Sequence, residues 1–360
     1  MLLKPLHILV ISPESWGISF LSKHHYAMAL CEMGHRVWFL NSPYGPTADL
    51  KQPHERLKVL DDRWFIKGLR HLPKFVQRRL MRRQIHQLKT HIGVDLDLIW
   101  SFDNSRYFHL DLFQALHTIH HVVDDHMDYQ LSYAASSADL CIGVTSNIVN
   151  RLKKHNAHCL LIPHGIKGPI LSHAGKIPLA SYKLHAAYVG NLLMRTFDAA
   201  LMLELVQAHK DIGFWLIGNY TPNHLSLNLP AQREDMLQQL RLQPNVHFHG
   251  ECSPDEAFAL ASKASILLSM YFENGRCPDN SSKVMPYLAS GKIIVSNHFA
   301  AYDGSDLLIM CKTRDAYLAL FAAALEGIER YNSPELHASR KAFAAKHSYD
   351  QLIKQIFERL

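Results

Sequence analysis

Residues 7–40 read HILVISPESWGISFLSKHHYAMALCEMGHRVWFL, and this stretch decides the fold. The apolar run at 7–12 predicts a short buried strand. A turn with one proline and one glycine follows, and the pattern over 21–33 then predicts a helix that a glycine ends. Residues 36–40 are a second apolar run of strand type. The order strand, helix, strand predicts a βαβ unit of a doubly wound parallel sheet.

The same alternation continues through the chain with one interruption. Residues 166–182 are rich in Gly, Pro, Ser and Lys without periodicity, as expected of a linker. Further strands are predicted before it at 97–101, 119–123, 140–145 and 158–163, and after it at 186–189, 214–217, 246–248, 266–269 and 293–296. We therefore expect an α/β protein with two Rossmann-like domains that face each other across a cleft, at 1–165 and 183–345. A single sheet of about a dozen strands is the alternative.

Composition excludes several classes of protein. Apolar residues make up 48% and charged residues 19%, which fits neither a disordered chain nor a series of membrane spans. The start carries no cleavable signal pattern, and the six cysteines are scattered without a Cys-x-x-Cys pair. The 25 histidines include adjacent pairs, but none has a third ligand at a recognisable spacing. We expect a cytoplasmic protein without a disulfide framework, a metal or another cofactor.

The net charge of +6 is concentrated in residues 63–94, which hold nine Lys or Arg and no acid. Helical spacing separates two apolar sets, one with Met81, Ile85, Leu88 and Ile92 and the other with Leu69, Leu72, Val76 and Leu80. We expect the first set to pack on the sheet. Residues 63–83, with Trp64, Phe65 and Arg70, are expected to contact an anionic membrane surface, which makes the protein peripheral at the inner face of the cell membrane. A solvated basic face is the alternative, and no nucleic-acid-binding module accompanies the charge.

Ligands of doubly wound sheets bind beyond the carboxyl ends of the strands, so the turns at these ends are the candidate sites. Gly17 follows the first strand, and Gly190 and Asn191 follow the first strand of the second half, with Arg195 nearby as a cation that suits a diphosphate. A plain strand-to-helix turn and a solvated arginine are the alternatives.

The loop and helix at 273–296 give the strongest signal. Pro286 is tolerated only in the first turn of a helix, which should therefore start near Ser282, with a serine as its cap. Lys283 would then lie at a helix N-terminus, an arrangement that predicts an anion site.

The segment at 283–295 resembles the Lys-x-x-Glu-Tyr-x-Ala-x-Gly-Lys-x-Val-Val run of bacterial glycosyltransferases with the two-domain GT-B architecture, particularly the retaining family-4 type. Residues 162–166 resemble the Pro-Asn-Gly hinge of that family, and 188–192 resemble its first strand in the nucleotide domain. Residues 122–126, together with 138–140 and 144–146, are similar to patterns of cell-envelope polysaccharide transferases. By this resemblance a helix within 346–360 crosses back onto the first domain.

One position departs from the family pattern. Pro286 stands where the family has a glutamate that binds the nucleotide ribose, and the Glu-x7-Glu pair is absent. Either Glu273 or Asp279 replaces it from the loop, or the ribose is held by backbone and Tyr287.

The resemblance implies transfer of a sugar from a nucleotide-diphosphate sugar to a glycan or lipid-linked acceptor in polysaccharide or cell-envelope synthesis. Retention is implied, with the leaving phosphate assisting deprotonation, whereas inversion requires a base such as Asp124 or His126. A non-catalytic nucleotide-sugar-binding protein and a nucleotide-sugar epimerase are the alternatives. The catalytic candidates are Asp124, His126, Arg195 and Lys283; the donor-binding candidates are Gly17, Gly190, Asn191, Arg195, Gly218, Asn280, Ser281, Ser282, Lys283 and Tyr287; the acceptor-side candidates are His24, His25 and Asp124. For each histidine, packing or surface solvation is the alternative.

Overall fold

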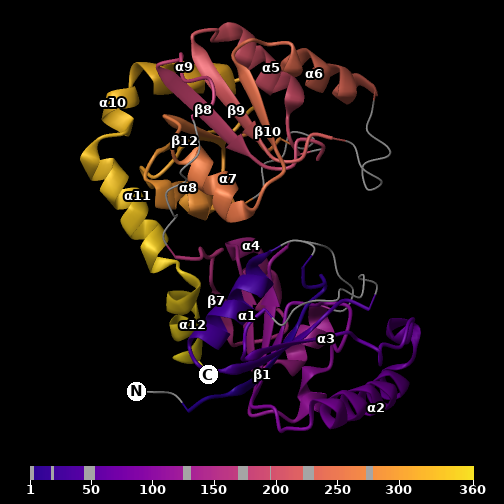
Figure 1. Ribbon diagram of the computed structural model, residues 1–360. Helices are drawn as coiled ribbons and strands as arrows, with labels where there is room; N and C mark the ends of the chain where they lie inside the picture. The colour runs from indigo at the N-terminus through magenta and orange to yellow at the C-terminus, as the bar shows by residue number, and fades with distance from the viewer. Residues whose placement is uncertain are drawn as a thin grey trace. The chain divides into compact units, whose positions relative to one another are not determined.

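The computed structural model describes residues 4–17, 20–43, 53–124, 131–168, 177–194, 196–221, 231–272 and 279–360. The chain forms two compact units. The first unit comprises residues 1–165 together with 347–360, and the second comprises 166–346. Each unit is built on its own parallel β-sheet (Figure 1).

The sheet of the first unit has seven strands in the order β3-β2-β1-β4-β5-β6-β7, and the neighbouring strands are parallel. Its strands are β1 (His7–Ile11), β2 (Arg36–Leu40), β3 (Leu57–Leu60), β4 (Leu98–Ser101), β5 (His117–Val122), β6 (Leu140–Gly143) and β7 (Cys159–Leu161). The helices of this unit are α1 (Ser22–Glu32), η1 (Leu69–His71), α2 (Lys74–Ile92), η2 (Leu110–Phe113), α3 (Leu131–Ser137), α4 (Ser146–Leu152) and α12 (Tyr349–Phe357).

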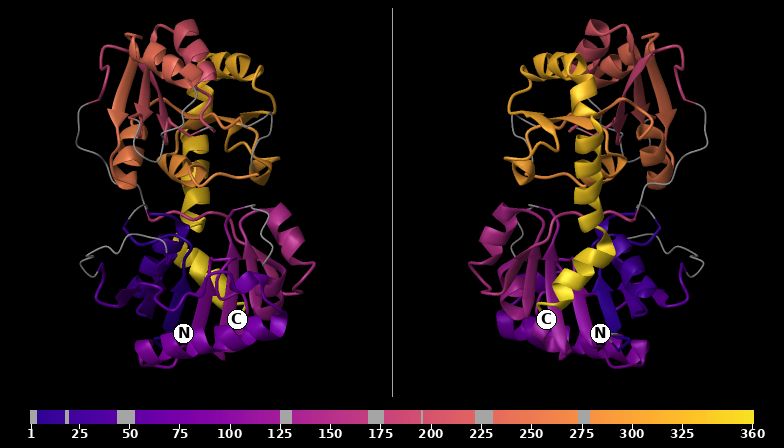
Figure 2. Two further views of the ribbon diagram at one scale, coloured as in Figure 1. Left: turned by 90° about the vertical axis from the view of Figure 1, so that its right-hand side faces the viewer. Right: turned by 90° about the vertical axis from the view of Figure 1, so that its left-hand side faces the viewer.

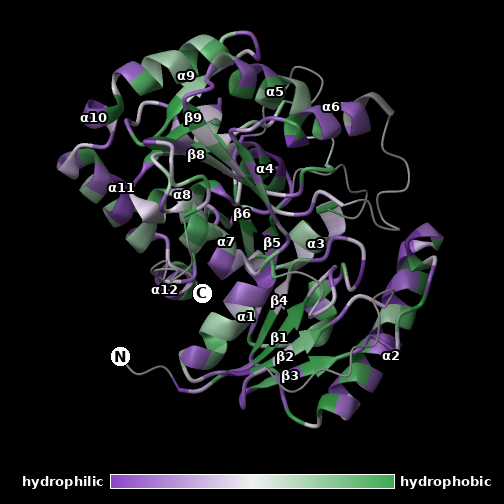
Figure 3. Cartoon of the chain, turned by 45° about the horizontal axis from the view of Figure 1, so that its top comes forward, coloured by the Kyte–Doolittle hydropathy of each residue, from purple (hydrophilic) through white to green (hydrophobic). Residues whose placement is uncertain are grey.

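Both faces of this sheet are covered, which explains why its strands β1, β2 and β4 are mostly apolar. Ile8 and Val10 of β1 pack in the core that contains residues of α1 and α12, whereas Leu9 and Ile11 point to the opposite core, which contains residues of α2. Figure 3 shows β1 to β4 coloured as hydrophobic and α2 carrying both colours. The last helix, α12, contacts α1 within the first unit and is the yellow helix among indigo and purple elements in Figure 2.

The sheet of the second unit has six parallel strands in the order β10-β9-β8-β11-β12-β13. Its strands are β8 (Leu184–Val189), β9 (Ile212–Ile217), β10 (Val246–Gly250), β11 (Ile266–Ser269), β12 (Ile293–Asn297) and β13 (Ile309–Cys311). Its helices are α5 (Ala199–Ala208), α6 (Ala231–Arg241), α7 (Pro254–Ala261), α8 (Val284–Ser290), η3 (Ala300–Tyr302), α9 (Tyr317–Glu326), α10 (Ile328–Tyr331) and α11 (Pro334–Lys346). Residues of α5, α6 and α9 contribute to one core, and residues of α7, α8 and α11 to the other.

The predicted α/β class with two doubly wound sheets is confirmed, but the sequence pattern misses two strands. β3 and β13 are edge strands of four and three residues. β3 reads LKVL, in which a lysine interrupts the apolar pattern, whereas β13 lies within the apolar run 307–311, which the predicted strands leave out.

The basic segment is only partly placed as predicted. The set with Met81 and Ile85 is buried in the core under the sheet, as expected. The assignment of Leu69 to a membrane-facing set is wrong, because its side chain is 6% exposed in the same core. Trp64 also packs against this core. The large apolar side chains of this segment that stay exposed are those of Leu72 and Phe75.

Candidate functional site

Gly190 and Gly218 allow the backbone to pack closely at the carboxyl ends of β8 and β9. The amide of Gly190 donates to the carbonyl of Ile217 (2.8 Å), and that of Gly218 to the carbonyl of Gly250 (2.9 Å). Gly218 has φ 141°, and a Cβ placed on it would lie 2.1 Å from the carbonyl oxygen of Gly190. Only glycine fits there without a shift, so these turns present bare backbone at the edge of the sheet.

Lys283 is held against this glycine edge. Its amino group donates to the hydroxyl of Tyr188 (3.3 Å) and lies 4.9 Å from the centre of the same ring. A Cβ on Gly190 would lie 2.2 Å from Nζ of Lys283. Among the described residues, Lys283 has no acidic partner. The structure therefore fixes a half-buried positive charge at the end of β8, where a missing side chain leaves room for it.

The segment before α8 supplies further polar groups next to Lys283 in the chain. Ser282 is exposed, and Ser281 is half-buried. Nδ2 of Asn280 is buried without a hydrogen-bond partner within the described ranges, while its Oδ1 accepts from the amide of Ser281 (2.7 Å). Asn280 thus retains an amide donor that a bound group could satisfy.

The first turn of α8 agrees with the proline argument but not with a serine cap. The helix begins at Val284, so Pro286 is its third residue, where the missing N–H needs no partner. The residue at the N-cap is Lys283, and no side chain caps the helix. The predicted serine cap is wrong, because the hydroxyl of Ser281 instead accepts from the amide of Lys283 (3.4 Å), before the helix begins.

The assignment of Tyr287 to ribose binding is also wrong. Its side chain is 1% exposed. Its hydroxyl accepts from the amide of Val189 (2.8 Å) and donates to the carbonyl of Leu268 (3.2 Å). Because backbone groups occupy the hydroxyl, Tyr287 anchors α8 to β8 and β11 instead of facing a ligand.

The remaining donor-side candidates lie in exposed turns or outside the described part. Asn191 is exposed, and its Oδ1 accepts from the amide of Leu193 (2.9 Å), which closes the turn after β8. Gly17 is exposed and has φ 91°, a left-handed conformation that favours glycine. Arg195 lies outside the described residues.

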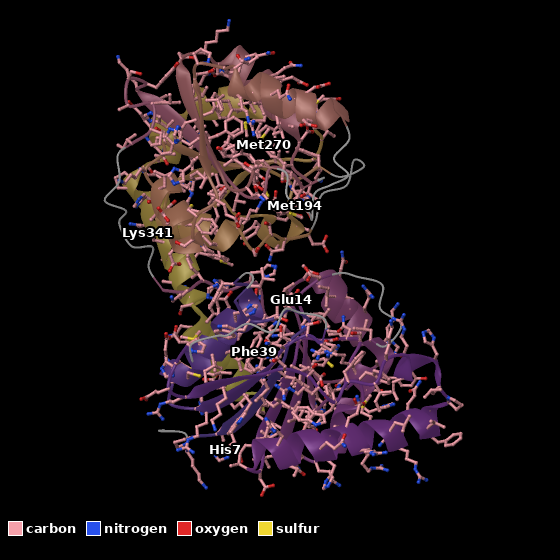
Figure 4. The ribbon with its side chains drawn as sticks, turned by 45° about the vertical axis from the view of Figure 1, so that its right-hand side comes forward. His7, Glu14, Phe39, Met194, Met270 and Lys341 are labelled. Carbon is pink, nitrogen blue, oxygen red and sulfur yellow. The ribbon has the colours of Figure 1, made fainter. Side chains whose placement is uncertain are left out.

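In the first unit, β1 runs from His7 towards the turn that carries Glu14, as the two labels in Figure 4 show. Asp124 follows β5 at this same carboxyl edge and is exposed, whereas His126 lies outside the described residues. Asp124 is thus available at the edge where ligands of parallel sheets bind.

The two histidines of α1 are packing residues. The side chain of His24 is fully buried against Trp16 and Phe39, and burial lowers its pKa to about 4, so it is neutral at pH 7. Its assignment to the acceptor side is wrong, because aromatic rings cover it. His25 stacks on the ring of Tyr349 at 5.1 Å, a contact that joins α1 to α12.

Sequence reasoning misses several polar residues at this edge. Lys23 is 2% exposed and pairs with Glu14. Burial lowers the pKa of His164 to about 4; the charge of Asp124 opposes this shift, and that of Lys23 adds to it. His121 is buried too, and burial lowers its pKa well below the ordinary value. These side chains come from separate segments, so no local motif could have found them.

A second missed cluster surrounds Arg106, which is 3% exposed. Its guanidinium donates to Asp103 (2.6 Å) and Asp62 (2.7 Å), and also to the backbone carbonyls of Asn41 (2.9 Å) and Ser12 (2.5 Å). These partners follow β4, β3, β2 and β1. One buried cation therefore holds the carboxyl ends of four strands together.

Within the described ranges, no group of three or more His, Cys, Asp or Glu side chains could hold a metal ion. In the same part of the chain, no helix is both long and apolar enough to cross a membrane.

No family model matches the chain, and no curated protein matches it either, but several solved structures do. The structure of a glycosyltransferase from Rickettsia africae ESF-5 is similar, with a TM-score of 0.72 and 11% sequence identity. The match covers 99% of this chain and 97% of that one. The structure of Anabaena Alr3699/HepE in complex with UDP and glucose is also similar, with a TM-score of 0.71 and 12% sequence identity. The match covers 99% of this chain and 100% of that one. The chain has the GT-B fold.

A sucrose-phosphate synthase from Thermosynechococcus elongatus also matches, with a TM-score of 0.70 and 14% identity over 98% of both chains. At these identities the likeness concerns the GT-B fold and not the chemistry. The reaction must therefore be argued from this chain's own residues.

Proposed function

We propose that the chain is a glycosyltransferase that uses a nucleotide-diphosphate sugar. The observation that carries the proposal is the amino group of Lys283, held against Gly190 at the carboxyl edge of the second sheet. A fixed cation beside bare backbone, in a fold whose ligands bind at this edge, suits a diphosphate. Structures of HepE with UDP and with UDP-glucose support this choice of ligand class.

In this proposal Lys283 binds the diphosphate and offsets the charge that develops when the bond between sugar and phosphate breaks. Asn280 and Ser282 donate hydrogen bonds to the same group, and Arg195 adds a second cation. No metal or other cofactor is assigned a role. Because Tyr287 is occupied by backbone, the ribose is assigned to a carboxylate of the preceding loop, Glu273 or Asp279.

The acceptor is assigned to the first unit, at the edge that carries Asp124. We propose a glycan or lipid-linked hydroxyl as acceptor, in polysaccharide or cell-envelope synthesis, and transfer with retention. In a retaining reaction the leaving phosphate takes the proton of the acceptor hydroxyl, and Asp124 orients the acceptor. If the product is inverted, Asp124 or His126 becomes the candidate base.

Binding of a nucleotide-sugar panel tests the donor site. UDP-, GDP-, ADP- and CMP-sugars are titrated by calorimetry into the wild-type chain and into Lys283→Met. We expect one of them to bind and Lys283→Met to weaken it about 10- to 100-fold, corresponding to ~1–3 kcal/mol for a lost charge-assisted contact. Lys341→Met, at an exposed lysine of α11 (Figure 4), removes the same charge elsewhere and should leave the affinity unchanged. Equal affinity of all three proteins would refute the assignment of Lys283.

Turnover distinguishes an enzyme from a binding protein of the same fold. Pro286 in place of the family's glutamate is the observation that favours the second. Slow hydrolysis of the bound sugar nucleotide, or transfer in the presence of a membrane extract, is expected. Tight binding with neither reaction would instead establish a non-catalytic nucleotide-sugar-binding protein.

We also propose that the first unit contacts an anionic membrane through the start of α2. The side chain of Phe75 is 75% exposed and that of Leu72 is 38% exposed. The exposed cations Arg70 and Lys74 lie beside them in the sequence. Exposed apolar side chains next to cations suit the headgroup region of an anionic bilayer, and they replace Trp64 in this role because Trp64 packs against the core.

Sedimentation with vesicles of phosphatidylglycerol and phosphatidylcholine tests this contact. Leu72→Ser with Phe75→Ser is expected to lower the affinity for the vesicles at least about tenfold, since burial of a large apolar side chain contributes ~1.5–3 kcal/mol. Leu242→Ser, at a leucine of the second unit that is 81% exposed, is the matched control and should bind as wild type does. Undiminished binding of the double variant would contradict the proposal.

A further inference from the structure

A pocket of about 440 Å³ opens in the first unit, away from Lys283 in the sequence. One wall is the segment 65–71, which follows β3, and another is the segment 105–108, which follows β4. Gln84 of α2 closes part of it. The volume falls within the range of small-molecule sites, roughly 300–1,000 Å³. The pocket is large enough for a phosphorylated monosaccharide.

The described residues that line the pocket include cations but no acid. Lys67 and Arg70 are exposed at the pocket wall. Arg70 donates through Nε to Nε2 of His71 (3.1 Å). Within the described ranges, neither Lys67 nor Arg70 has an acidic partner. Arg106 also lines the pocket, but its guanidinium is already paired with the buried carboxylates of Asp62 and Asp103, so its charge is not available to a ligand. The available positive charge is therefore that of Lys67 and Arg70.

The backbone that carries Lys67 and Arg70 is held in place by contacts with the core and with α2. Leu69, between them in the sequence, is anchored in the hydrophobic core. Gln77 of α2 donates through Nε2 to the carbonyls of Arg70 (3.2 Å) and Leu72 (2.8 Å). A chain anchored on both sides of Arg70 loses less conformational entropy when a ligand binds, which favours a built anion site over two freely moving surface charges.

The rest of the lining is apolar or aromatic, with Phe65, Ile66 and Phe108 among its residues. Such surfaces pack against the C–H faces of sugar rings, while Ser105 and Gln84 add side-chain oxygens that can accept hydrogen bonds from hydroxyls. A lining of this composition matches a ligand that is anionic at one end and sugar-like at the other.

We propose that this pocket binds the phosphate ester of a sugar, with the phosphate at Lys67 and Arg70 and the ring against the apolar wall. The inference rests on the proposed function, because it assigns the bound group to the acceptor. The segment 105–108 follows β4, and Asp124 follows β5, the next strand of the sheet, at the same carboxyl edge. The acceptor would then carry a phosphate on the sugar unit that enters the pocket, one strand away from Asp124.

Calorimetric titration of the full chain with glucose 6-phosphate, glucose and inorganic phosphate tests the pocket. We expect glucose 6-phosphate to bind at least about tenfold more tightly than either of the other two, because only it has both parts. The double variant Lys67→Gln with Arg70→Gln should bind glucose 6-phosphate at least about tenfold more weakly than the wild-type chain does. Arg82→Gln with Arg83→Gln is the matched control: both arginines are exposed on α2 outside the pocket lining, and the net charge changes equally.

The outcomes separate this site from the donor site and from a lipid headgroup. Lys283→Met should leave glucose 6-phosphate binding unchanged; a loss there would overturn the proposal by placing the ligand at the donor site. Equal affinity for inorganic phosphate and glucose 6-phosphate would overturn the proposal. So would a protein that binds vesicles of phosphatidic acid but does not bind glucose 6-phosphate. If glucose 6-phosphate binds as expected while no sugar nucleotide binds, the pocket stands and the proposed transferase fails.

Discussion

Arg106→Met is expected to lower the free energy of unfolding of the first unit by about 3–5 kcal/mol. The substitution leaves Asp62 and Asp103 buried without their cation. It also removes the donors to the carbonyls of Ser12 and Asn41, which help to tie four strand ends together. Burial raises the pKa of Asp62, and the charge of Arg106 opposes this shift, so the carboxylate depends on its cation.

Urea unfolding followed by tryptophan fluorescence measures this effect. Four of the five tryptophans precede residue 166, and Trp215→Phe removes the fifth, so the signal then reports on the first unit. Arg79→Met, at an exposed arginine of α2, should change the free energy of unfolding by less than about 0.5 kcal/mol. Arg106→Met with Asp62→Asn and Asp103→Asn should be less destabilised than Arg106→Met alone, because no unpaired charge remains. If Arg106→Met is as stable as Arg79→Met, the cluster around Arg106 does not contribute to the stability of the first unit.

Acidification from about pH 6.5 to about pH 4 is expected to destabilise the first unit by several kcal/mol. Burial lowers the pKa of His24, His109, His120 and His164 to about 4 each. In the unfolded chain these imidazoles take up protons near their ordinary pKa of about 6.5, whereas in the folded chain they do so only near the lowered value. Since the unfolded state binds more protons in this window, stability is complete above about pH 6.5 and falls as the pH is lowered, by as much as ~1.4 kcal/mol per pH unit for each histidine.

The urea midpoint of the Trp215→Phe protein, measured from neutral pH down to about pH 4, tests this expectation. His120 is the residue to change, because its side chain is fully buried and neither ring nitrogen has a hydrogen-bond partner within the described ranges. His120→Leu should reduce the slope of stability against pH in this window, and near the middle of the window it should be at least as stable as the unchanged protein. An unchanged slope would mean that His120 does not bind protons differently in the two states.

The sequence predicts part of the candidate donor site, namely the start of α8 and the position of Lys283. Pro286 predicts the start of α8 within two residues of its observed position, because a proline ring is compatible only with the first turn. The same argument places Lys283 at the carboxyl edge of the second sheet, and the structure brings its amino group against Gly190. That contact itself could not be predicted, since it joins residues far apart in the chain through a space left by a missing Cβ.

The polar residues that the sequence pattern assigns wrongly share one cause. It assigns His24 and Tyr287 to ligand binding, yet their side chains are buried against aromatic rings and backbone. A polar residue has the same one-letter code whether it faces a ligand, water or a backbone carbonyl. Only the folded chain shows which partner it has.

The sequence by itself determined that the chain has two parallel sheets, because most of their strands are short apolar runs and the segments between them follow helical periodicity. The tertiary structure decided the rest. It gathered the ends of four strands around Arg106, formed the pocket from segments 65–71 and 105–108, and set Lys283 beside Gly190. Each of these depends on contacts between residues far apart in the chain, which local pattern does not encode.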